Sequence, residues 1–292
     1  MPSGTNTGAA AAVAVVAGTD EVLAHPEADE RLLEPAERVR AARFRHESAR
    51  RDFVAAHLLA RICAGLLLDV GPAAVALAQH CDDCAEDGHG KPYLPDHPTA
   101  QVSMAHTPGV VAAAAGAATV GIDVELTARR PATPALLERA LSGNELRLLG
   151  RHGDPQATFL RQWVRKEALV KAGRADLGAL YELDLSGMRL GPRRHFGGDA
   201  AWVQDGRFEQ FHVLDLADER RGVLASVVSG TPVRLTALSV TAETGAVPPS
   251  SAEPSSAELS SFEPTSFEPS SAKPSSAEPP SAEPTSFEPS SA

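Results

Sequence analysis

The hydrophobic and polar positions along the first 245 residues indicate a mixture of helices and strands. An apolar run over residues 9–16 predicts an opening strand. Residues 32–68 are rich in alanine, leucine and arginine, and apolar side chains recur there with helical spacing, so we expect one long helix. The apolar positions that share one face of this helix are Leu58, Leu59, Ile62 and Leu66.

Residues 110–126 carry two conflicting signals. The alanine-rich centre favours a helix by intrinsic propensity. Gly116 interrupts it, however, and Val120, Ile122 and Val124 alternate with other residues in the way that strands do. We therefore expect a strand, a turn and a second strand.

The second part of the chain predicts two helices followed by strands. Residues 134–149 and 157–172 have helical patterns, and short apolar runs separated by turns over residues 181–228 are typical of antiparallel strands. This order of elements predicts an α+β fold with two similar lobes. We place the lobes at residues 1–119 and 120–245.

The C-terminal segment, residues 246–292, is a five-residue repeat of the type SSAEP. Proline in nearly every repeat excludes a continuous helix. The few phenylalanines bury too little surface to offset the entropy of ordering the segment. We predict a disordered tail, whose seven glutamates and one lysine supply much of the chain's net charge of −11.

Charge and composition exclude several classes of protein. The acidic net charge of −11 argues against a general nucleic-acid binder. No apolar run is long enough to span a membrane, and no basic residue precedes the apolar run near the start, as a secretory signal requires. Three cysteines give no disulfide framework. These features predict a reduced, cytoplasmic protein.

A first candidate for chemistry is the sequence Val120-Gly-Ile-Asp123-Val-Glu125. Residues two apart on a strand point to the same face, so the carboxylates of Asp123 and Glu125 are expected to project together. A divalent cation such as Mg²⁺ relieves the repulsion between two such carboxylates. An exposed acidic strand edge is the simpler alternative.

A second candidate is Trp163-Val-Arg-Lys166-Glu167-Ala-Leu-Val-Lys171. On a helix, Trp163, Glu167 and Lys171 lie along one face. An ordinary surface ion pair between Glu167 and Lys171 is the simpler alternative. The tryptophan one turn earlier favours a face that is at least partly buried.

Together the two segments resemble the surfactin-type 4′-phosphopantetheinyl transferases. The signature of that family is a G-(I/V)-D-x-E strand followed by W-x-x-K-E-(A/S)-x-x-K on a helix. The matching residues are Gly121, Asp123, Glu125, Trp163, Lys166, Glu167, Ala168 and Lys171. Upstream, Gly90-Lys91-Pro92, the stretch from Val102 to His106 and the pair Arg50-Arg51 are similar to further family elements. Ala105 departs from the family, which has a serine before the histidine.

The resemblance implies a Mg²⁺ site and a catalytic pair. Asp123, Glu125 and Glu167 are expected to hold Mg²⁺ together with the pyrophosphate of coenzyme A. Glu167 is also the expected general base on a serine hydroxyl. Lys171 is expected to assist the departure of 3′,5′-ADP.

The resemblance also implies contacts with coenzyme A. The expected contact residues are Arg51, Lys91, His106, Lys166 and Lys171. Arg51 would meet the 3′-phosphate, although Arg50 matches equally well after a shift of one residue. A structural histidine is the alternative for His106.

The implied activity is the transfer of 4′-phosphopantetheine from coenzyme A to a serine of an apo acyl or peptidyl carrier protein. The implied fold is a monomer with two lobes related by a pseudo-twofold axis. Residues 1–119 are expected to bind the adenine and 3′-phosphate of coenzyme A, and residues 120–245 are expected to carry the metal and catalytic motifs. The carrier pathway, polyketide or nonribosomal peptide, and the tolerance of acyl-coenzyme A stay open. Two alternatives remain: a non-catalytic homologue that docks carrier proteins, and another Mg²⁺-dependent phosphoryl-transfer enzyme.

Cys81-Asp-Asp-Cys84 lies just before the Gly90-Lys91-Pro92 element, with His80 and His89 nearby. Such a group of side chains is able to bind zinc. The sequence has no second Cys-x-x-Cys, so a surface feature without metal is the favoured interpretation.

Overall fold

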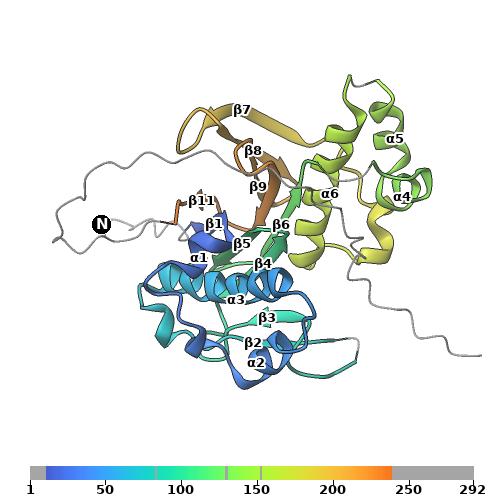
Figure 1. Ribbon diagram of the computed structural model, residues 1–292. Helices are drawn as coiled ribbons and strands as arrows, with labels where there is room; N and C mark the ends of the chain where they lie inside the picture. The colour runs from blue at the N-terminus through green and yellow to red at the C-terminus, as the bar shows by residue number, and fades with distance from the viewer. Residues whose placement is uncertain (1–10, 83, 129–130, 152, 239–292) are drawn as a thin grey trace, which may run out of the picture. The chain divides into compact units, whose positions relative to one another are not determined.

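The computed structural model describes residues 11–82, 84–128, 131–151 and 153–238, which belong to one compact unit. Two main sheets and two long helices make up this unit (Figure 1). No helix in the described part of the chain is long and apolar enough to cross a membrane.

The first sheet has the strand order β11-β1-β5-β4. Its strands are β1 (Ala12–Gly18), β4 (Gln101–Thr107), β5 (Val110–Gly116) and β11 (Val233–Leu235). β1 and β4 flank β5 in antiparallel pairing, and β11 lies parallel to β1, so the end of the described chain returns to its opening strand.

The second sheet is antiparallel, with the order β6-β10-β9-β8-β7. Its strands are β6 (Val120–Leu126), β7 (Arg189–His195), β8 (Ala201–Phe208), β9 (Phe211–Asp218) and β10 (Val223–Ser229). β2 (Ala78–His80) and β3 (Lys91–Tyr93) pair with each other in a small antiparallel hairpin, which is a separate sheet from the other two.

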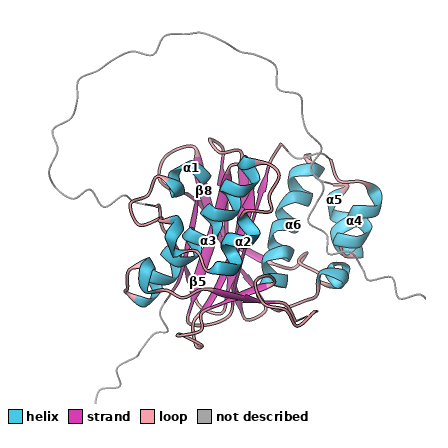
Figure 2. Ribbon diagram, turned by 60° about the horizontal axis from the view of Figure 1, so that its bottom comes forward, coloured by secondary structure: helices cyan, strands magenta, loops and turns pink. Residues whose placement is uncertain are grey.

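The long helices are α3 (Glu47–Leu68) and α6 (Pro155–Lys171), and Figure 2 shows α3 in front of the strands and α6 beside them. The shorter helices are α1 (Thr19–Leu23), α2 (Pro35–Ala41), α4 (Pro134–Ala140) and α5 (Gly143–Leu149). Short 3-10 helices lie at Glu30–Leu32, Pro72–Ala74 and Leu177–Glu182.

Several apolar clusters hold these layers together. One core fills the space between α3 and the first sheet, with Leu59 and Ala113 at 0% exposure. A second core joins the inner faces of the two sheets, where Ala112 of β5 and Ile122 of β6 are fully buried. Further apolar contacts join the second sheet to α6, which includes the fully buried Ala168. Each long helix therefore covers the outer face of one sheet.

The two halves share one strand order. In the first half β1 pairs with β5 and β5 pairs with β4, while in the second half β6 pairs with β10 and β10 pairs with β9. In each half the long helix follows the first of these strands along the chain. The predicted α+β fold with two similar lobes is confirmed. The boundary between residues 119 and 120 stays a prediction, and the predicted disordered tail lies outside the described residues.

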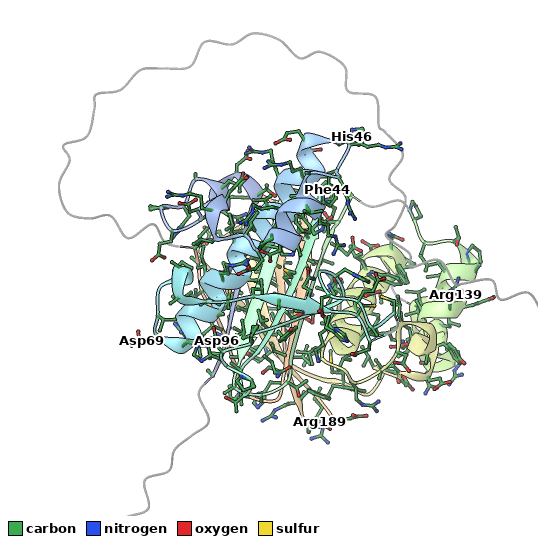
Figure 3. All side chains as sticks on the ribbon, turned by 90° about the horizontal axis from the view of Figure 1, so that it is seen from below. Phe44, His46, Asp69, Asp96, Arg139 and Arg189 are labelled. Carbon is green, nitrogen blue, oxygen red and sulfur yellow. The ribbon has the colours of Figure 1, made fainter. Side chains whose placement is uncertain are left out.

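The expected long helix over residues 32–68 was wrong in extent. The chain leaves the helical path after Ala41, and Phe44 and His46 lie in the loop that separates α2 from α3 (Figure 3). The ring of Phe44 packs against Phe53 of α3, with centroids 5.3 Å apart. This tertiary contact outweighs a helix propensity that continues through the loop.

The expected helix over residues 134–149 is also two helices. Ser142 is the N-cap of α5: its hydroxyl oxygen accepts a hydrogen bond from the amide of Glu145, and the Glu145 carboxylate accepts one from the amide of Ser142. This capping box is a helix start that can be read from a sequence. By contrast, the strand, turn and strand over residues 110–126 are confirmed as β5 and β6.

Candidate active site

Strand β6 divides its side chains between the core and the outer helix. Ile122 and Val124 are buried between the two sheets. Asp123 and Glu125 point the other way and both contact α6. The expected projection of these two carboxylates to one face is confirmed, and that face lies against a helix instead of open solvent.

Gly121 sets how closely α6 approaches β6. A Cβ atom at this position would lie 2.0 Å from the carbonyl oxygen of Ala168 and 2.7 Å from the amide nitrogen of Ala172. No side chain fits between such backbone atoms, so only glycine permits this approach. The glycine of the motif thus brings the polar side chains of α6 within reach of the β6 carboxylates.

Two hydrogen bonds align the helix with the strand. The indole Nε1 of Trp163 donates to the Glu125 carboxylate at 3.2 Å. Two turns later, the ammonium of Lys171 donates to Asp123 Oδ1 at 2.7 Å. Glu167 lies one helical turn from each of these residues, on the same face. Helical spacing therefore places Glu167 on the face of α6 that meets Asp123 and Glu125.

The ion pair of Lys171 with Asp123 is only partly screened from solvent. The Asp123 side chain is 11% exposed and that of Lys171 is 30% exposed. An ammonium thus stands beside a nearly buried carboxylate that the sequence predicts as a metal ligand. The site already accommodates positive charge next to Asp123.

A buried ion pair, which sequence reasoning missed, extends the row of polar side chains across the sheet. Asp123, Ser226 and Asp215 are direct cross-strand neighbours on β6, β10 and β9. Asp215 accepts hydrogen bonds from the guanidinium of Arg165 on α6, at 2.5 and 3.0 Å. Residues 165 and 215 are far apart along the chain, and no local pattern in the sequence pairs them.

His106 approaches this group from the first half of the chain. It is the penultimate residue of β4 and remains accessible to solvent. Neighbouring protein atoms displace water from the ring and lower the pKa of His106. The positive charge of Lys171 lowers this pKa further, while the carboxylate of Asp52 raises it. His106 therefore lies within electrostatic range of Lys171 on α6.

The other expected contacts with coenzyme A lie on the surface of the first half. Lys91 is exposed on β3. Arg51 is exposed on α3 and pairs with Asp20 at 2.6 Å. Its alternative, Arg50, pairs with Glu30 at 2.7 Å. The structure brings none of these three into contact with the carboxylate group, and their roles stay predictions.

Lys166 does not join the group, and the expected phosphate contact needs correction. Its side chain is 0% exposed and points away from β6. The ammonium donates to the Glu145 carboxylate at 2.6 Å and to the carbonyl oxygens of Ala140 and Leu180 at 2.7 and 2.9 Å. These three bonds use all of its N–H donors. Lys166 therefore anchors α5, the end of α4 and the 3-10 helix at Leu177–Glu182 to α6.

The donor set of the site fits a hard divalent cation. Asp123, Glu125 and Glu167 offer carboxylate oxygens, which Mg²⁺ prefers over nitrogen and sulfur. Magnesium is commonly held by one or two carboxylates plus phosphate oxygens and water. The Asp123–Lys171 pair is partly accessible to solvent, from which such ligands would come.

The fold and site together define an α+β protein whose acidic strand and facing helix suit metal-assisted phosphoryl chemistry. Residues 119–225, which include β6, α6 and all the carboxylates of the site, match the model of the 4′-phosphopantetheinyl transferase superfamily. This match confirms the resemblance to that superfamily that the sequence indicates.

Two curated relatives from Bacillus subtilis agree. The chain is 33% identical over 104 residues to 4′-phosphopantetheinyl transferase ffp, covering 35% of this chain and 45% of that protein. It is 26% identical over 155 residues to a second 4′-phosphopantetheinyl transferase, covering 52% of this chain and 64% of the relative. The matches thus span less than two thirds of either relative.

Proposed function

We propose that the protein transfers the 4′-phosphopantetheine arm of coenzyme A to a serine hydroxyl of an apo carrier protein, releasing 3′,5′-ADP. One observation supports this proposal: Trp163 and Lys171 of α6 donate hydrogen bonds to Glu125 and Asp123 of β6, inside the region that matches the superfamily. The proposed partners are coenzyme A and an apo acyl or peptidyl carrier protein of polyketide or nonribosomal peptide synthesis. We expect a cytoplasmic monomer.

Asp123, Glu125 and Glu167 would hold Mg²⁺ in this proposal. When bound, the ion supplies Lewis-acid polarisation of the reacting phosphate and neutralises developing charge. The strand and the helix fix the three carboxylates on rigid elements, so little reorganisation is needed when the phosphates arrive.

Glu167 is the proposed general base. Its carboxylate would take the proton of the carrier serine, directly or through one water, as the hydroxyl oxygen attacks the phosphorus. A positioned base of this kind contributes about 10²- to 10⁴-fold to a rate. Trp163 supports it by fixing Glu125 on one side, through the hydrogen bond at 3.2 Å.

Lys171 is the proposed partner of the leaving group. In the free protein its ammonium neutralises Asp123. We propose that it turns to a phosphate oxygen of the departing 3′,5′-ADP once coenzyme A is bound. His106, Lys91 and Arg51 remain the proposed further phosphate contacts, with Arg50 as the alternative to Arg51. Lys166 is not part of this proposal.

The test is the intact mass of an apo carrier protein after incubation with the enzyme, coenzyme A and Mg²⁺. We expect a gain of one phosphopantetheine, abolished by EDTA and by Glu167→Ala. No gain with carriers from several pathways, combined with retained carrier binding, would favour the docking-only homologue. Cleavage of a nucleic acid with no action on coenzyme A would favour another Mg²⁺-dependent enzyme.

A further inference from the structure

The hairpin of β2 and β3 closes a loop, residues 81–90, that the proposed reaction does not use. His80 pairs with Lys91 at the base of this loop, and Gln79 Nε2 donates to the carbonyl oxygen of Gly90 at 3.0 Å. Gly90 has φ +86°, and a Cβ atom there would lie 2.3 Å from the carbonyl oxygen of His80. The two ends of the loop are thus held together closely.

The loop gathers two thiols and an imidazole. The ligand atoms of Cys81, Cys84 and His89 all lie within 4.8 Å of one another. The Sγ of Cys84 is 3.2 Å from Nε2 of His89. Cys81 and Cys84 are both reduced. Sulfur and nitrogen ligands at such separations are able to contact one ion at the metal–ligand distances of about 2.0 to 2.3 Å that zinc adopts.

We propose that Cys81, Cys84 and His89 bind one Zn²⁺ ion. Thiolate and imidazole are the ligands that zinc prefers, whereas Mg²⁺ requires oxygen. This site is therefore chemically distinct from the carboxylates of β6 and α6. Cys84 is exposed, so water completes the tetrahedron on the outer side.

The backbone of the loop holds the ligands in this arrangement. The amide of Ala85 donates to the carbonyl oxygen of Cys81 at 2.8 Å, and the amide of Cys81 donates to that of Glu86 at 3.0 Å. Ala85 adopts φ +57°, a left-handed conformation that costs energy for a residue with a side chain. The tight turn that results places Cys84 back against His89.

The surroundings of the cluster suit a cation. Asp82, Glu86 and Asp87 are exposed carboxylates of the same loop. His80 does not belong to the cluster, because its Nδ1 is 2.8 Å from the Asp87 carboxylate. We infer that the ion crosslinks the loop and thereby holds the hairpin that carries Lys91. This role does not depend on the activity proposed above.

The experiment is zinc uptake by untagged, metal-free, reduced protein. Zn²⁺ is titrated against a chromophoric chelator in the presence of excess Mg²⁺, which occupies oxygen-ligand sites. We expect one equivalent of zinc per chain. Cys84→Ser and His89→Gln should each weaken the affinity for zinc by at least about 10-fold. Even mutation of a residue that only hydrogen-bonds to a metal ligand lowers metal affinity by about this factor.

Two controls make the result specific. His80→Gln and Glu167→Gln should bind zinc as the unaltered protein does. With Co²⁺ in place of Zn²⁺, the unaltered protein should show sulfur-to-metal charge-transfer absorption, and Cys81→Ser and Cys84→Ser should reduce it. Less than a tenth of an equivalent of zinc, or uptake that is the same in the Cys81→Ser/Cys84→Ser double variant, would overturn the proposal.

Discussion

In both halves of the molecule a long helix packs against a sheet, but the side chains at this contact differ between the halves. In the second half they are the polar residues for which we propose a catalytic role. Each half has a long helix that covers three strands of identical order. Against the first sheet, α3 places apolar side chains, and the thiol of Cys63 meets the carbonyl oxygen of Ala113 at 3.3 Å. Against the second sheet, α6 places Trp163 and Lys171 opposite carboxylates.

The halves also share a buried ion pair on the other side of each helix. Arg61 of α3 pairs with Glu37 of α2 at 2.7 Å, and Lys166 of α6 pairs with Glu145 of α5 at 2.6 Å. In both cases the glutamate also accepts a hydrogen bond from an amide at the start of its own short helix.

This comparison separates what the fold needs from what the proposed reaction needs. Both halves have a buried ion pair, Arg61–Glu37 or Lys166–Glu145, that joins a short helix to the long helix, and we call this pair the clamp. Because both halves contain it, the clamp is part of the fold.

In the first half the strands β1, β4 and β5 carry no acidic residue, and the buried carboxylate of Asp52 lies on the helix α3 instead. The first half thus shows that this fold packs without carboxylates on the strands that face the long helix. Packing of the second half therefore does not explain the presence of Asp123 and Glu125, which agrees with the role proposed for them.

The largest expected effect on stability comes from removing one clamp. Lys166→Met leaves the Glu145 carboxylate buried without its cation, which should lower the free energy of unfolding by about 3 to 5 kcal/mol. Lys171→Met removes a partly exposed pair and should cost about 1 kcal/mol or less. Urea denaturation of both variants measures the difference. Equal destabilisation by the two substitutions would contradict the claim that Lys166 stabilises the fold whereas Lys171 contributes little to stability.

The next effect concerns the approach of α6 to β6. Gly121→Ala places a methyl group 2.0 Å from the carbonyl oxygen of Ala168, and overpacking against backbone should cost about 3 kcal/mol. Gly191→Ala in β7 is the matched control, since the nearest atom to its Cβ lies at 3.5 Å. Thermal denaturation should show a large loss for the first variant and a change within about 0.5 kcal/mol for the second. A stable Gly121→Ala protein would refute the close approach.

The smallest effect concerns an ion pair that joins the halves. Glu21 of α1 pairs with Arg221 in the turn between β9 and β10, at 2.6 Å. The hydrogen bond from Arg221 lowers the pKa of Glu21 from its usual 4.5. Because the carboxyl is half exposed, Glu21→Gln should cost less than about 1 kcal/mol at neutral pH.

The pH dependence of this pair has a definite sign. A lowered pKa in the folded state gives stability that is present above the unfolded value and is lost as pH falls through the folded value. The difference between Glu21→Gln and the unaltered protein should therefore disappear in strong acid. Urea denaturation across pH measures it, with the exposed Glu219→Gln as control. A difference that persists below both pKa values would show that the pair acts by packing instead of charge.

Much of the site could be predicted because the strand motif and the helix motif that form it are both local sequence patterns. A strand places Asp123 and Glu125 on one face, and a helix aligns Trp163, Glu167 and Lys171, whatever surrounds them. The predicted phosphate contact of Lys166 was wrong because helical spacing does not show which face of α6 meets the sheet. Only the packing of α5 shows that this lysine is enclosed.

The elements that sequence reasoning missed have different causes. The helix start at Ser142 was readable, since Ser142 and Glu145 form a capping box. The break at Phe44 and the pairing of Arg165 with Asp215 depend on contacts between distant parts of the chain. Such contacts leave no periodic signal in the sequence. For Cys81, Cys84 and His89 the sequence favoured a surface feature without metal, because it does not show that the loop places the three ligands together.

The most direct test of the central claim is the single-turnover rate of carrier modification by Glu167→Gln, followed by intact mass. The substitution keeps the size of the side chain and removes its charge. The exposed Glu138→Gln on α4 is the matched control, and circular dichroism checks that both variants are folded. We predict a rate at least about 100-fold lower for Glu167→Gln and an unchanged rate for Glu138→Gln. A folded Glu167→Gln protein that modifies the carrier within about twofold of the normal rate would show that the β6–α6 face is not the active site.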